Sequence, residues 1–298
     1  FEYRLHSDDH FIEGICKAGE YGLVPLTGIV SNGVFSWYCD VPTGEATGGV
    51  EGWVYVGDMA TMSGRWRDTE GGEGTFRLSS FVPVEGLVGH YPFEGSAMDH
   101  SGRGNHGAEM NGVAYADGEI GQCAVLDGVD DYVDFGNGSD MRLTKDFTIS
   151  LWCVSEMAEG CHGTLFAKSA GHPQQSSRSL EWEVENSSAN GHRPYSYFWS
   201  STGYFDGWLE PQAIPEDEWT HLVLQHDSSL PEYQMRMFLN GVEKVVGVGH
   251  QTTSSIPELR TVSDTVKVGC QRLGYAHFAG RIDELRIYRR VLSPSEVM

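Results

Sequence analysis

The sequence predicts an all-β protein with many turns. Val, Thr, Tyr, Phe and Trp recur in short runs, many of which alternate between apolar and polar residues. The chain of 298 residues contains 38 glycines and lacks long helical periodicity. Hydrophobic residues make up 40% of the chain, which is enough for a real core, and the length allows one large β domain or two smaller ones.

Residues 1–84 form the first region, in which strand patterns are short and regularly spaced. Leu26–Val30 and Val34–Cys39 flank Asn32-Gly33, a pair typical of a tight hairpin turn. The other alternating runs are Phe1–Leu5, His10–Cys16, Val50–Val56, Met62–Trp66 and Gly74–Leu78. This spacing favours hairpin neighbours, so we expect a small antiparallel sandwich or barrel. A proline and a glycine interrupt the pattern within Phe81–Gly86, which predicts the domain boundary there.

Residues 85–298 form the second region, which contains a longer series of strand patterns. In chain order these are Leu87–Glu94, Cys123–Phe135, Phe147–Cys153, Gly163–Ala167, Leu180–Glu185, Tyr195–Trp199, Trp219–Gln225, Met235–Gly241, Val266–Cys270 and Phe278–Tyr288. After the first pattern, the polar loop Asp99–Gly107 has few bulky groups. Such a loop could present carbonyl and carboxylate oxygens to a hard cation, or it could be a plain long turn.

The last of these runs predicts a buried strand that changes face once. The apolar residues Ile282 and Leu285 enclose the charged pair Asp283 and Glu284, so we expect the change near Glu284. Carboxylates in the middle of a buried strand need a partner from elsewhere in the chain. The segment Ser293–Glu296 that follows is typical of a helix start, with a serine cap, a proline and a glutamate three residues after the cap.

The formal net charge of −22 excludes some classes of partner. Without a basic stripe to neutralise phosphates, nucleic-acid binding is not expected, and neither is binding to an anionic membrane surface. No apolar run approaches the length of a membrane span. The acidic charge fits a solvated surface that keeps a secreted protein soluble, or cation binding.

The chain has six cysteines and no CxxC pair, which argues against a zinc ribbon. An even number of cysteines in a glycine-rich acidic β protein suggests disulfides and an oxidising compartment. The simplest pairing within regions is Cys16 with Cys39, Cys153 with Cys161, and Cys123 with Cys270. Reduced, buried thiols are the alternative.

An ordered series of motifs in the second region resembles the LamG-like jelly roll, of the concanavalin A-like lectin and glucanase superfold. The motifs are Tyr91-Pro-Phe-Glu94, Asp99–Gly107, Leu126–Val133, Phe147–Trp152, Trp219–Leu224, Phe238–Gly241 and Gly280–Tyr288. The resemblance implies an antiparallel two-sheet jelly-roll sandwich over 85–298, usually extracellular. Members of this superfold bind glycans, bind proteins or space other domains, so the fold alone does not decide function.

The resemblance also implies a structural calcium ion between the loop after the first strand and the last strand. Matched residue by residue, the ligands would be Glu94, Asp99 and Asp283, with Asn105 or loop carbonyls completing the shell. Calcium takes six to eight oxygen ligands and tolerates irregular geometry, so this set suits it. In the alternative, Asp99 caps a turn and Asp283 faces water.

Three carboxylates alternate along one strand pattern. Glu181, Glu183 and Glu185 are spaced by two residues, so they share one strand face. Glycoside hydrolases of this superfold carry a similar acidic cluster, with one carboxylate as nucleophile and another as acid/base. Here the middle residue is Glu183 rather than Asp, and within the LamG-like pattern the strand is an ordinary one. A polysaccharide-degrading enzyme is therefore an alternative and not the main expectation.

A dense group of aromatic residues follows this strand. Its members are Tyr195, Tyr197, Phe198, Trp199, Tyr204, Phe205 and Trp208. Tyr and Trp rings can stack on sugar rings, and Asp206 could bind sugar hydroxyls. Tyr197, Trp199, Tyr204, Asp206 and Trp208 are the predicted ligand-binding residues. The alternative is a half-buried strand with a loop packed over the sandwich.

Together these features predict an extracellular or cell-surface binding or adhesion module that recognises carbohydrate or a protein partner. A structural subunit of an extracellular assembly, which displays the lectin-like domain, is a second hypothesis. A homo-oligomer or a larger assembly fits either function.

Overall fold

The structure is a computed structural model. It describes residues 85–169, 177–271 and 275–297 together with the backbone of seven strands within residues 1–84. The chain divides into two compact units, Phe1–Val84 and Glu85–Met298, and each is described by itself. No helix in the described residues is long and apolar enough to cross a membrane.

The first unit is antiparallel. β1 (Glu2–Leu5), β2 (Phe11–Lys17), β3 (Leu23–Ser31), β4 (Val34–Cys39) and β5 (Gly49–Trp53) form one sheet in chain order, and β6 (Thr61–Arg67) pairs with β7 (Glu73–Ser79). Consecutive strands are therefore neighbours, as their regular spacing predicts. Among the described strands β1 and β5 are open edges, so this sheet is not closed into a barrel. The predicted turn at Asn32-Gly33 lies outside the described residues.

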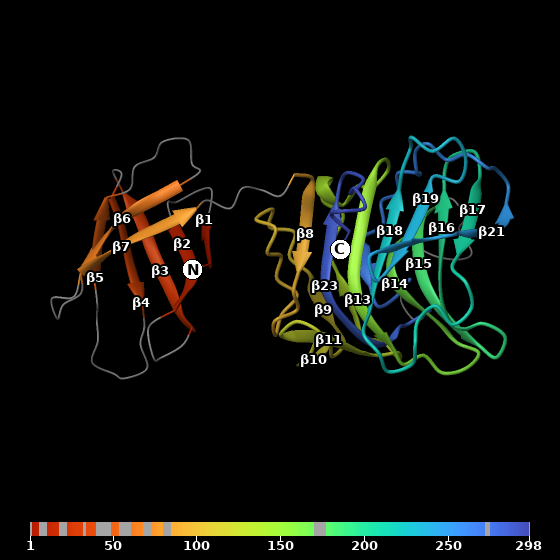
Figure 1. Ribbon diagram of the computed structural model, residues 1–298, viewed down its shortest axis with the longest axis horizontal. Coiled ribbons are helices and arrows are strands. Elements are labelled where there is room, and N and C mark those ends of the chain that lie inside the picture. The colour runs from red at the N-terminus through yellow and green to blue at the C-terminus, as the bar shows by residue number, and fades with distance from the viewer. Residues whose placement is uncertain are drawn as a thin grey trace. The chain divides into compact units, whose positions relative to one another are not determined.

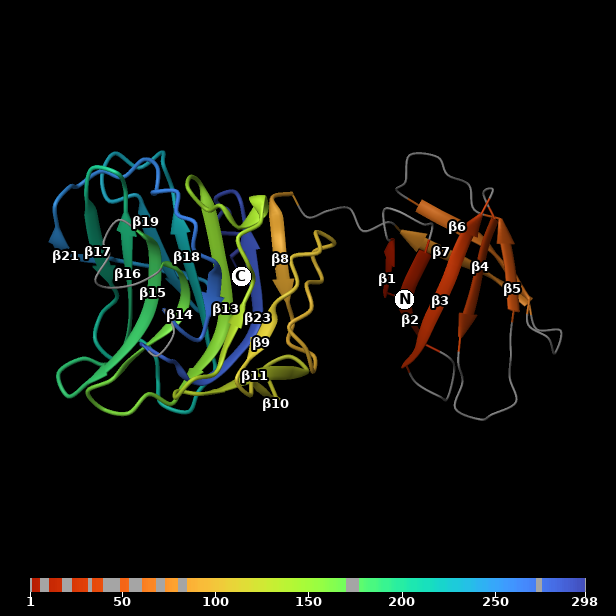
Figure 2. The same ribbon diagram turned by 180° about the vertical axis from the view of Figure 1, so that it is seen from behind.

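The second unit is a sandwich of two antiparallel eight-stranded sheets, which confirms the predicted architecture (Figures 1 and 2). In the first sheet the order is β10 (Ala114–Asp117), β11 (Gln122–Asp127), β23 (Ala279–Tyr288), β13 (Phe147–Ser155), β18 (Thr220–His226), β19 (Met235–Leu239) and β20 (Val242–Lys244), with β8 (Leu87–Tyr91) also paired to β23. In the second it is β21 (Gly247–Gln251), β17 (Tyr204–Trp208), β16 (Gly191–Trp199), β15 (Arg178–Ser187), β14 (His162–Ser169), β22 (Val266–Val268), β12 (Tyr132–Asp134) and β9 (Ala108–Met110).

Apolar residues of both sheets meet in one core. Alternate residues of β15, Leu180, Trp182 and Val184, belong to it, together with Phe147 and Ile149 of β13. The strand period of two places the residues between them on the opposite, outer face of their sheet. The outer face of the second sheet is therefore formed by the residues that lie between these core residues along each of its strands.

β23 occupies the middle of the first sheet. It pairs with β13 on one side, and on the other with β11 at its first half and β8 at its second half. The register against β13 shifts between Ser150 and Trp152, opposite Glu284, whose φ is 50°. This bulge confirms the predicted change of face near Glu284. The predicted helix start is instead a turn in the described residues, in which the Glu296 carboxylate accepts a hydrogen bond from Ser293 N at 2.9 Å.

Two of the expected disulfides are wrong, because the four cysteines of the second unit are free thiols. Cys153 is buried in β13 of the first sheet, whereas Cys161 is exposed ahead of β14 of the second. Cys123 lies in β11 of the first sheet, and Cys270 follows β22 of the second. Each expected pair would thus have to bridge from one sheet to the other. The side chains of Cys16 and Cys39 lie outside the described residues.

Candidate functional site

The outer face of the second sheet brings together two groups of residues that the sequence presents as separate features. Across β15 and β16, Glu181 pairs with Tyr197 and Glu183 pairs with Tyr195. Directly opposed residues of antiparallel strands share a face. Across β16 and β17, the same face gains the pairs Tyr195–Trp208, Tyr197–Asp206 and Trp199–Tyr204. The strand register therefore places the carboxylates of β15 on the same sheet face as every one of the predicted ligand-binding residues.

The two carboxylates at the centre of this face are buried and hydrogen-bonded. Glu181 is 1% exposed and accepts a hydrogen bond from Ser169 Oγ at 2.5 Å. Glu183 is 2% exposed and accepts hydrogen bonds from the Tyr195 hydroxyl and from Gln271 Nε2. Burial, and next the charge of Glu183, raises the pKa of Glu181 to about 7, and burial raises the pKa of Glu183 as well. Neither side chain is open to a substrate.

The third carboxylate of this strand, Glu185, is also engaged. It is half-buried and lies 2.5 Å from Arg193 Nη2, and it accepts a hydrogen bond from Asn190 Nδ2 at 2.8 Å. Glycosidase carboxylates must reach the glycosidic bond or a water beside it. The burial of Glu181 and Glu183 and the ion pair of Glu185 therefore favour a supporting role for this strand over catalysis.

The aromatic residues differ in how much surface they offer. Trp199 is only 4% exposed, stacks with Tyr197 at a ring distance of 5.2 Å, and has the Arg178 guanidinium over its ring, also at 5.2 Å. Tyr195, Tyr197, Tyr204 and Trp208 are half-buried. These four side chains thus form the accessible part of the aromatic group.

Trp208 lies flat against β21 because that strand has glycines beneath the ring. A Cβ added at Gly249 would lie 2.1 Å from Trp208 Cζ3, and one added at Gly247 would lie 2.6 Å from Trp208 Nε1. The Arg193 guanidinium approaches the ring at 5.5 Å. The sequence pattern does not predict β21, because glycines at alternate positions give no apolar alternation.

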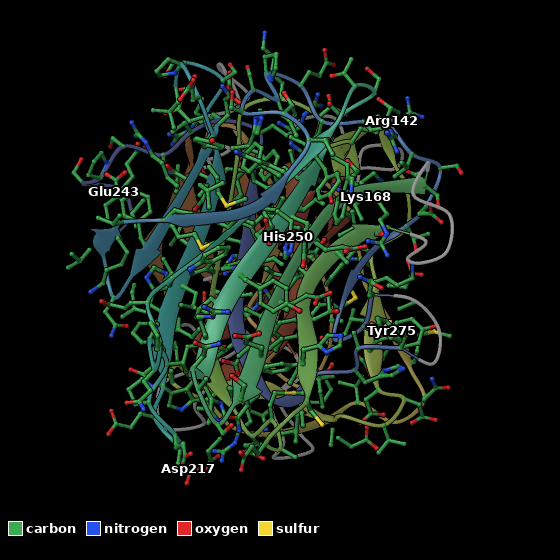
Figure 3. The ribbon with its side chains drawn as sticks, turned by 90° about the vertical axis from the view of Figure 1, so that its right-hand side faces the viewer. Arg142, Lys168, Asp217, Glu243, His250 and Tyr275 are labelled. Carbon is green, nitrogen blue, oxygen red and sulfur yellow. The ribbon has the colours of Figure 1, made fainter. Side chains whose placement is uncertain are left out.

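Asp206 is the polar partner of this aromatic surface. It is 6% exposed, its Oδ1 has no hydrogen-bond partner in the described residues, and its Oδ2 lies 3.8 Å from Nδ1 of His250. Burial raises the pKa of Asp206. His250 is exposed and lies near the centre of the side turned to the viewer in Figure 3, in front of the green strands.

Two of the four predicted calcium ligands converge on one turn of the chain. The Glu94 carboxylate accepts a hydrogen bond from Gln122 N at 3.2 Å, and Asp283 Oδ2 accepts one from Ile120 N at 2.9 Å. Asp283 is fully buried, and its Oδ1 has no partner in the described residues. Buried polar atoms normally have a partner, so the unpartnered Oδ1 of Asp283 is the one feature here that fits a cation.

The other two predicted ligands have different contacts. Asp99 Oδ1 accepts hydrogen bonds from the backbone N–H groups of His90 and Ser101, and its Oδ2 accepts them from Ser101 Oγ and Asn105 N. Both oxygens are therefore occupied, as in the turn-capping alternative. Asn105 Nδ2 donates to Val88 O at 2.7 Å, which ties the loop to β8. These two side chains therefore hold the loop in shape.

A cavity of about 210 Å³ lies elsewhere, between the segment Arg142–Phe147 and Arg289. None of the predicted site residues lines it.

The fold and this face define the class of protein, a lectin-like β-sandwich. Residues 127–298 match a family model described as the concanavalin A-like lectin/glucanases superfamily, and the chain belongs to this family. Comparison with curated protein sequences gave no match.

Solved structures with this fold include sugar-bound domains. Domain 4 of AbnA, a GH43 extracellular arabinanase from Geobacillus stearothermophilus in complex with arabinotriose, is 26% identical, with a TM-score of 0.52 over 71% of this chain and 96% of that one. The binding domain of Paraclostridial Mosquitocidal Protein 1 is 18% identical, with a TM-score of 0.53 over 71% of this chain and 51% of that one. The ligand-binding domain of botulinum neurotoxin serotype D, in complex with N-acetylneuraminic acid, is 11% identical, with a TM-score of 0.51 over 71% and 49% of the two chains. This chain thus spans about half of each toxin domain, and these two likenesses concern the fold.

Proposed function

We propose that the second unit is an extracellular carbohydrate-binding module and that it binds sugar on the outer face of β15, β16 and β17. The observation that carries the proposal is the strand register, which sets the half-buried rings of Tyr197, Tyr204 and Trp208 on one face. Rings held in this way present apolar surface at low cost in conformational entropy.

The polar groups of this face would orient the ligand. The exposed His250 beside Asp206 would offer a hydrogen-bond donor at the edge of the aromatic surface, and the Arg193 guanidinium lies over the Trp208 ring while it pairs with Glu185. The buried Glu183 beside these rings fixes Tyr195, whose hydroxyl donates a hydrogen bond to its carboxylate. The arabinotriose complex of the 26% identical domain supports a neutral oligosaccharide as ligand.

We also propose a structural calcium ion, held by Glu94, Asp283 and carbonyl groups of the turn between Gly118 and Gln122. The ion would neutralise two carboxylates and join β23 to the loop after β8. The unpartnered Oδ1 of Asp283 supports this site. Asp99 and Asn105 would shape the neighbouring loop without touching the ion.

Replacement of the accessible tryptophan tests the sugar-binding surface. Trp208→Ala should weaken binding of arabinan-derived oligosaccharides about fivefold or more, because a stacked ring is worth roughly 1 kcal/mol or more to binding. Isothermal titration calorimetry, preceded by a glycan array to choose the best ligand, measures the change.

Trp152→Ala is the matched control, since Trp152 is a partly exposed tryptophan on β13 of the other sheet, with its ring tilted against His221 at a centroid distance of 5.1 Å. It should leave affinity unchanged. Equal affinity of wild-type protein and Trp208→Ala, with the fold intact, would contradict the proposed surface. Failure of the wild-type protein to bind any glycan would favour a protein partner instead.

A further inference from the structure

Basic side chains gather at the cavity between the segment Arg142–Phe147 and Arg289. Arg142, Lys145 and Arg289 line this cavity, and Asp146 is the only carboxylate among the described residues that line it. The lining thus carries a net positive charge, although the whole chain has a formal net charge of −22. A local excess of cations in an acidic protein favours a small anion at that place.

The fold holds the segment that forms one wall of the cavity. Met141 and Leu143 are 0% and 2% exposed and belong to the core, whereas Arg142 between them is exposed. Leu259 N donates a hydrogen bond to Thr144 O at 2.6 Å, which fixes the next part of the segment. This wall is therefore preformed, and a ligand would not have to order it at a cost in entropy.

Two of the three cations lack the partners that other basic residues of this protein have. Arg281 Nη2, for example, lies 2.8 Å from Glu156 Oε1. Neither Arg142 nor Lys145 forms an ion pair or a side-chain hydrogen bond with any residue that the structure describes. Cations that line one cavity repel one another, so an anion bound among them would be stabilising.

The third cation and the carboxylate of the cavity differ in how firmly they are held. Arg289 Nη1 lies 3.8 Å from Asp140 Oδ1, and the arginine is exposed, so this pair is a weak one. Asp146 Oδ1 accepts a hydrogen bond from Ser228 N at 2.8 Å, from a residue that does not line the cavity. Arg289 thus remains available to an anion, whereas Asp146 is already compensated in part.

The size of the cavity limits its ligand. A volume of about 210 Å³ is smaller than the roughly 300–1,000 Å³ of pockets for drug-sized ligands, so the space suits a small ion or a single substituent group. The net charge of −22 disfavours a long polyanion, which would also meet the acidic surface around the cavity.

We propose that Arg142, Lys145 and Arg289 bind a small tetrahedral oxyanion, a sulfate or phosphate group, in this cavity. A guanidinium donates paired N–H groups to the oxygens of such an anion, and an ammonium adds a compact positive charge. The free ion and a sulfated or phosphorylated sugar offer the same chemistry. None of the three residues belongs to the sugar-binding face, so the proposal holds whether or not that face binds sugar.

Calorimetric titration of the full chain with sodium sulfate and with sodium phosphate, at an ionic strength kept constant with sodium chloride, tests the proposal. Arg142→Gln and Lys145→Gln each remove one positive charge and should weaken oxyanion binding about fivefold or more. Both side chains are exposed, so the fold should be unchanged, which circular dichroism checks.

Arg103→Gln is the matched control, because Arg103 is also an exposed arginine and lies outside the cavity. It should leave the titration unchanged. Equal oxyanion affinity of wild-type protein, Arg142→Gln and Lys145→Gln would overturn the proposal. An equal loss of affinity in Arg103→Gln, or a wild-type protein that binds neither anion, would overturn it as well.

Titration with a sulfated monosaccharide and with its neutral parent sugar identifies the source of the oxyanion. Tighter binding of the sulfated sugar than of free sulfate, lost in Arg142→Gln, assigns the cavity to a substituent of a glycan. Equal binding of the two assigns it to the free ion. If the sulfated sugar bound Arg142→Gln as tightly as wild-type protein, a sugar-borne ligand for this cavity would be ruled out.

Discussion

At the scale of single residues, Asp283 shows why a carboxylate stands in the middle of a buried strand. It is fully buried, one oxygen accepts the Ile120 N–H, and the other has no partner in the described residues. Burial raises its pKa to about 6. The folded protein thus favours the protonated acid, and near neutral pH the ionised form is destabilising unless a cation compensates it.

The variant Asp283→Asn should therefore be more stable than the wild-type protein in chelator at about pH 7.5, and the difference should vanish near pH 4. The penalty is absent below the unfolded-state pKa of about 3.9, grows as pH rises through about 6, and is complete above that value. Added calcium should raise the melting temperature of the wild-type protein and not that of the variant. Thermal unfolding by circular dichroism measures both effects.

The calcium ligand set would be wrong if calcium shifted the melting temperatures of wild-type protein and Asp283→Asn equally. Asp99→Asn is the comparison. Its oxygens serve hydrogen bonds within the loop, so it should lower stability without changing the response to calcium. Sequence alone could not separate these two aspartates, because the difference lies in which donors the folded backbone brings to them.

At the scale of elements, the glycines of β21 leave the space that the Trp208 ring occupies. A methyl group at Gly249 would meet the indole ring at 2.1 Å. Gly249→Ala should displace the ring, weaken sugar binding by about as much as Trp208→Ala does, and destabilise the protein by about 1–3 kcal/mol. Binding and chemical denaturation measured on the same sample check the prediction.

Gly138→Ala provides the control for the loss of a glycine. A Cβ there would meet only Asn105 Oδ1 at 3.6 Å, an ordinary contact, and φ at this residue is −58°. We expect wild-type affinity from it. Unchanged sugar binding in Gly249→Ala would mean that the flat position of Trp208 is not needed.

Individual strands were predictable, but their partners were not. The alternation of apolar and polar residues predicted β13, β15, β16 and β23, because a strand with one apolar face shows a period of two. The short polar strands β9 and β10 and the glycine-containing β21 lack that period and were missed. The pairing of Glu183 with Tyr195 depends on contacts between strands. The glutamates of β15 and the aromatic residues were therefore predicted as two separate groups, and nothing in the sequence showed that they share a face.

At the scale of the whole molecule, residues 85–298 contain a complete core of their own. The main hydrophobic cluster runs from Val88 to Ile287 and draws on both sheets. A fragment of residues 85–298 should therefore unfold cooperatively and bind sugar as the full chain does. Differential scanning calorimetry and titration with the same glycan test this. A fragment without a cooperative transition would show that the second unit depends on the first.

Because β23 lies in the middle of the first sheet, that sheet cannot be completed until this late strand has been synthesised. This strand lies between β13 on one side and β11 and β8 on the other, yet residues 279–288 are made after all of these neighbours. Until β23 emerges, β13 and β11 each expose one edge, and β8 has no partner among the described strands. We therefore expect the unpaired strand edges of the nascent chain to promote aggregation. Folding of the first sheet can be completed only after β23 has been made, and it then depends on contacts between residues distant in sequence.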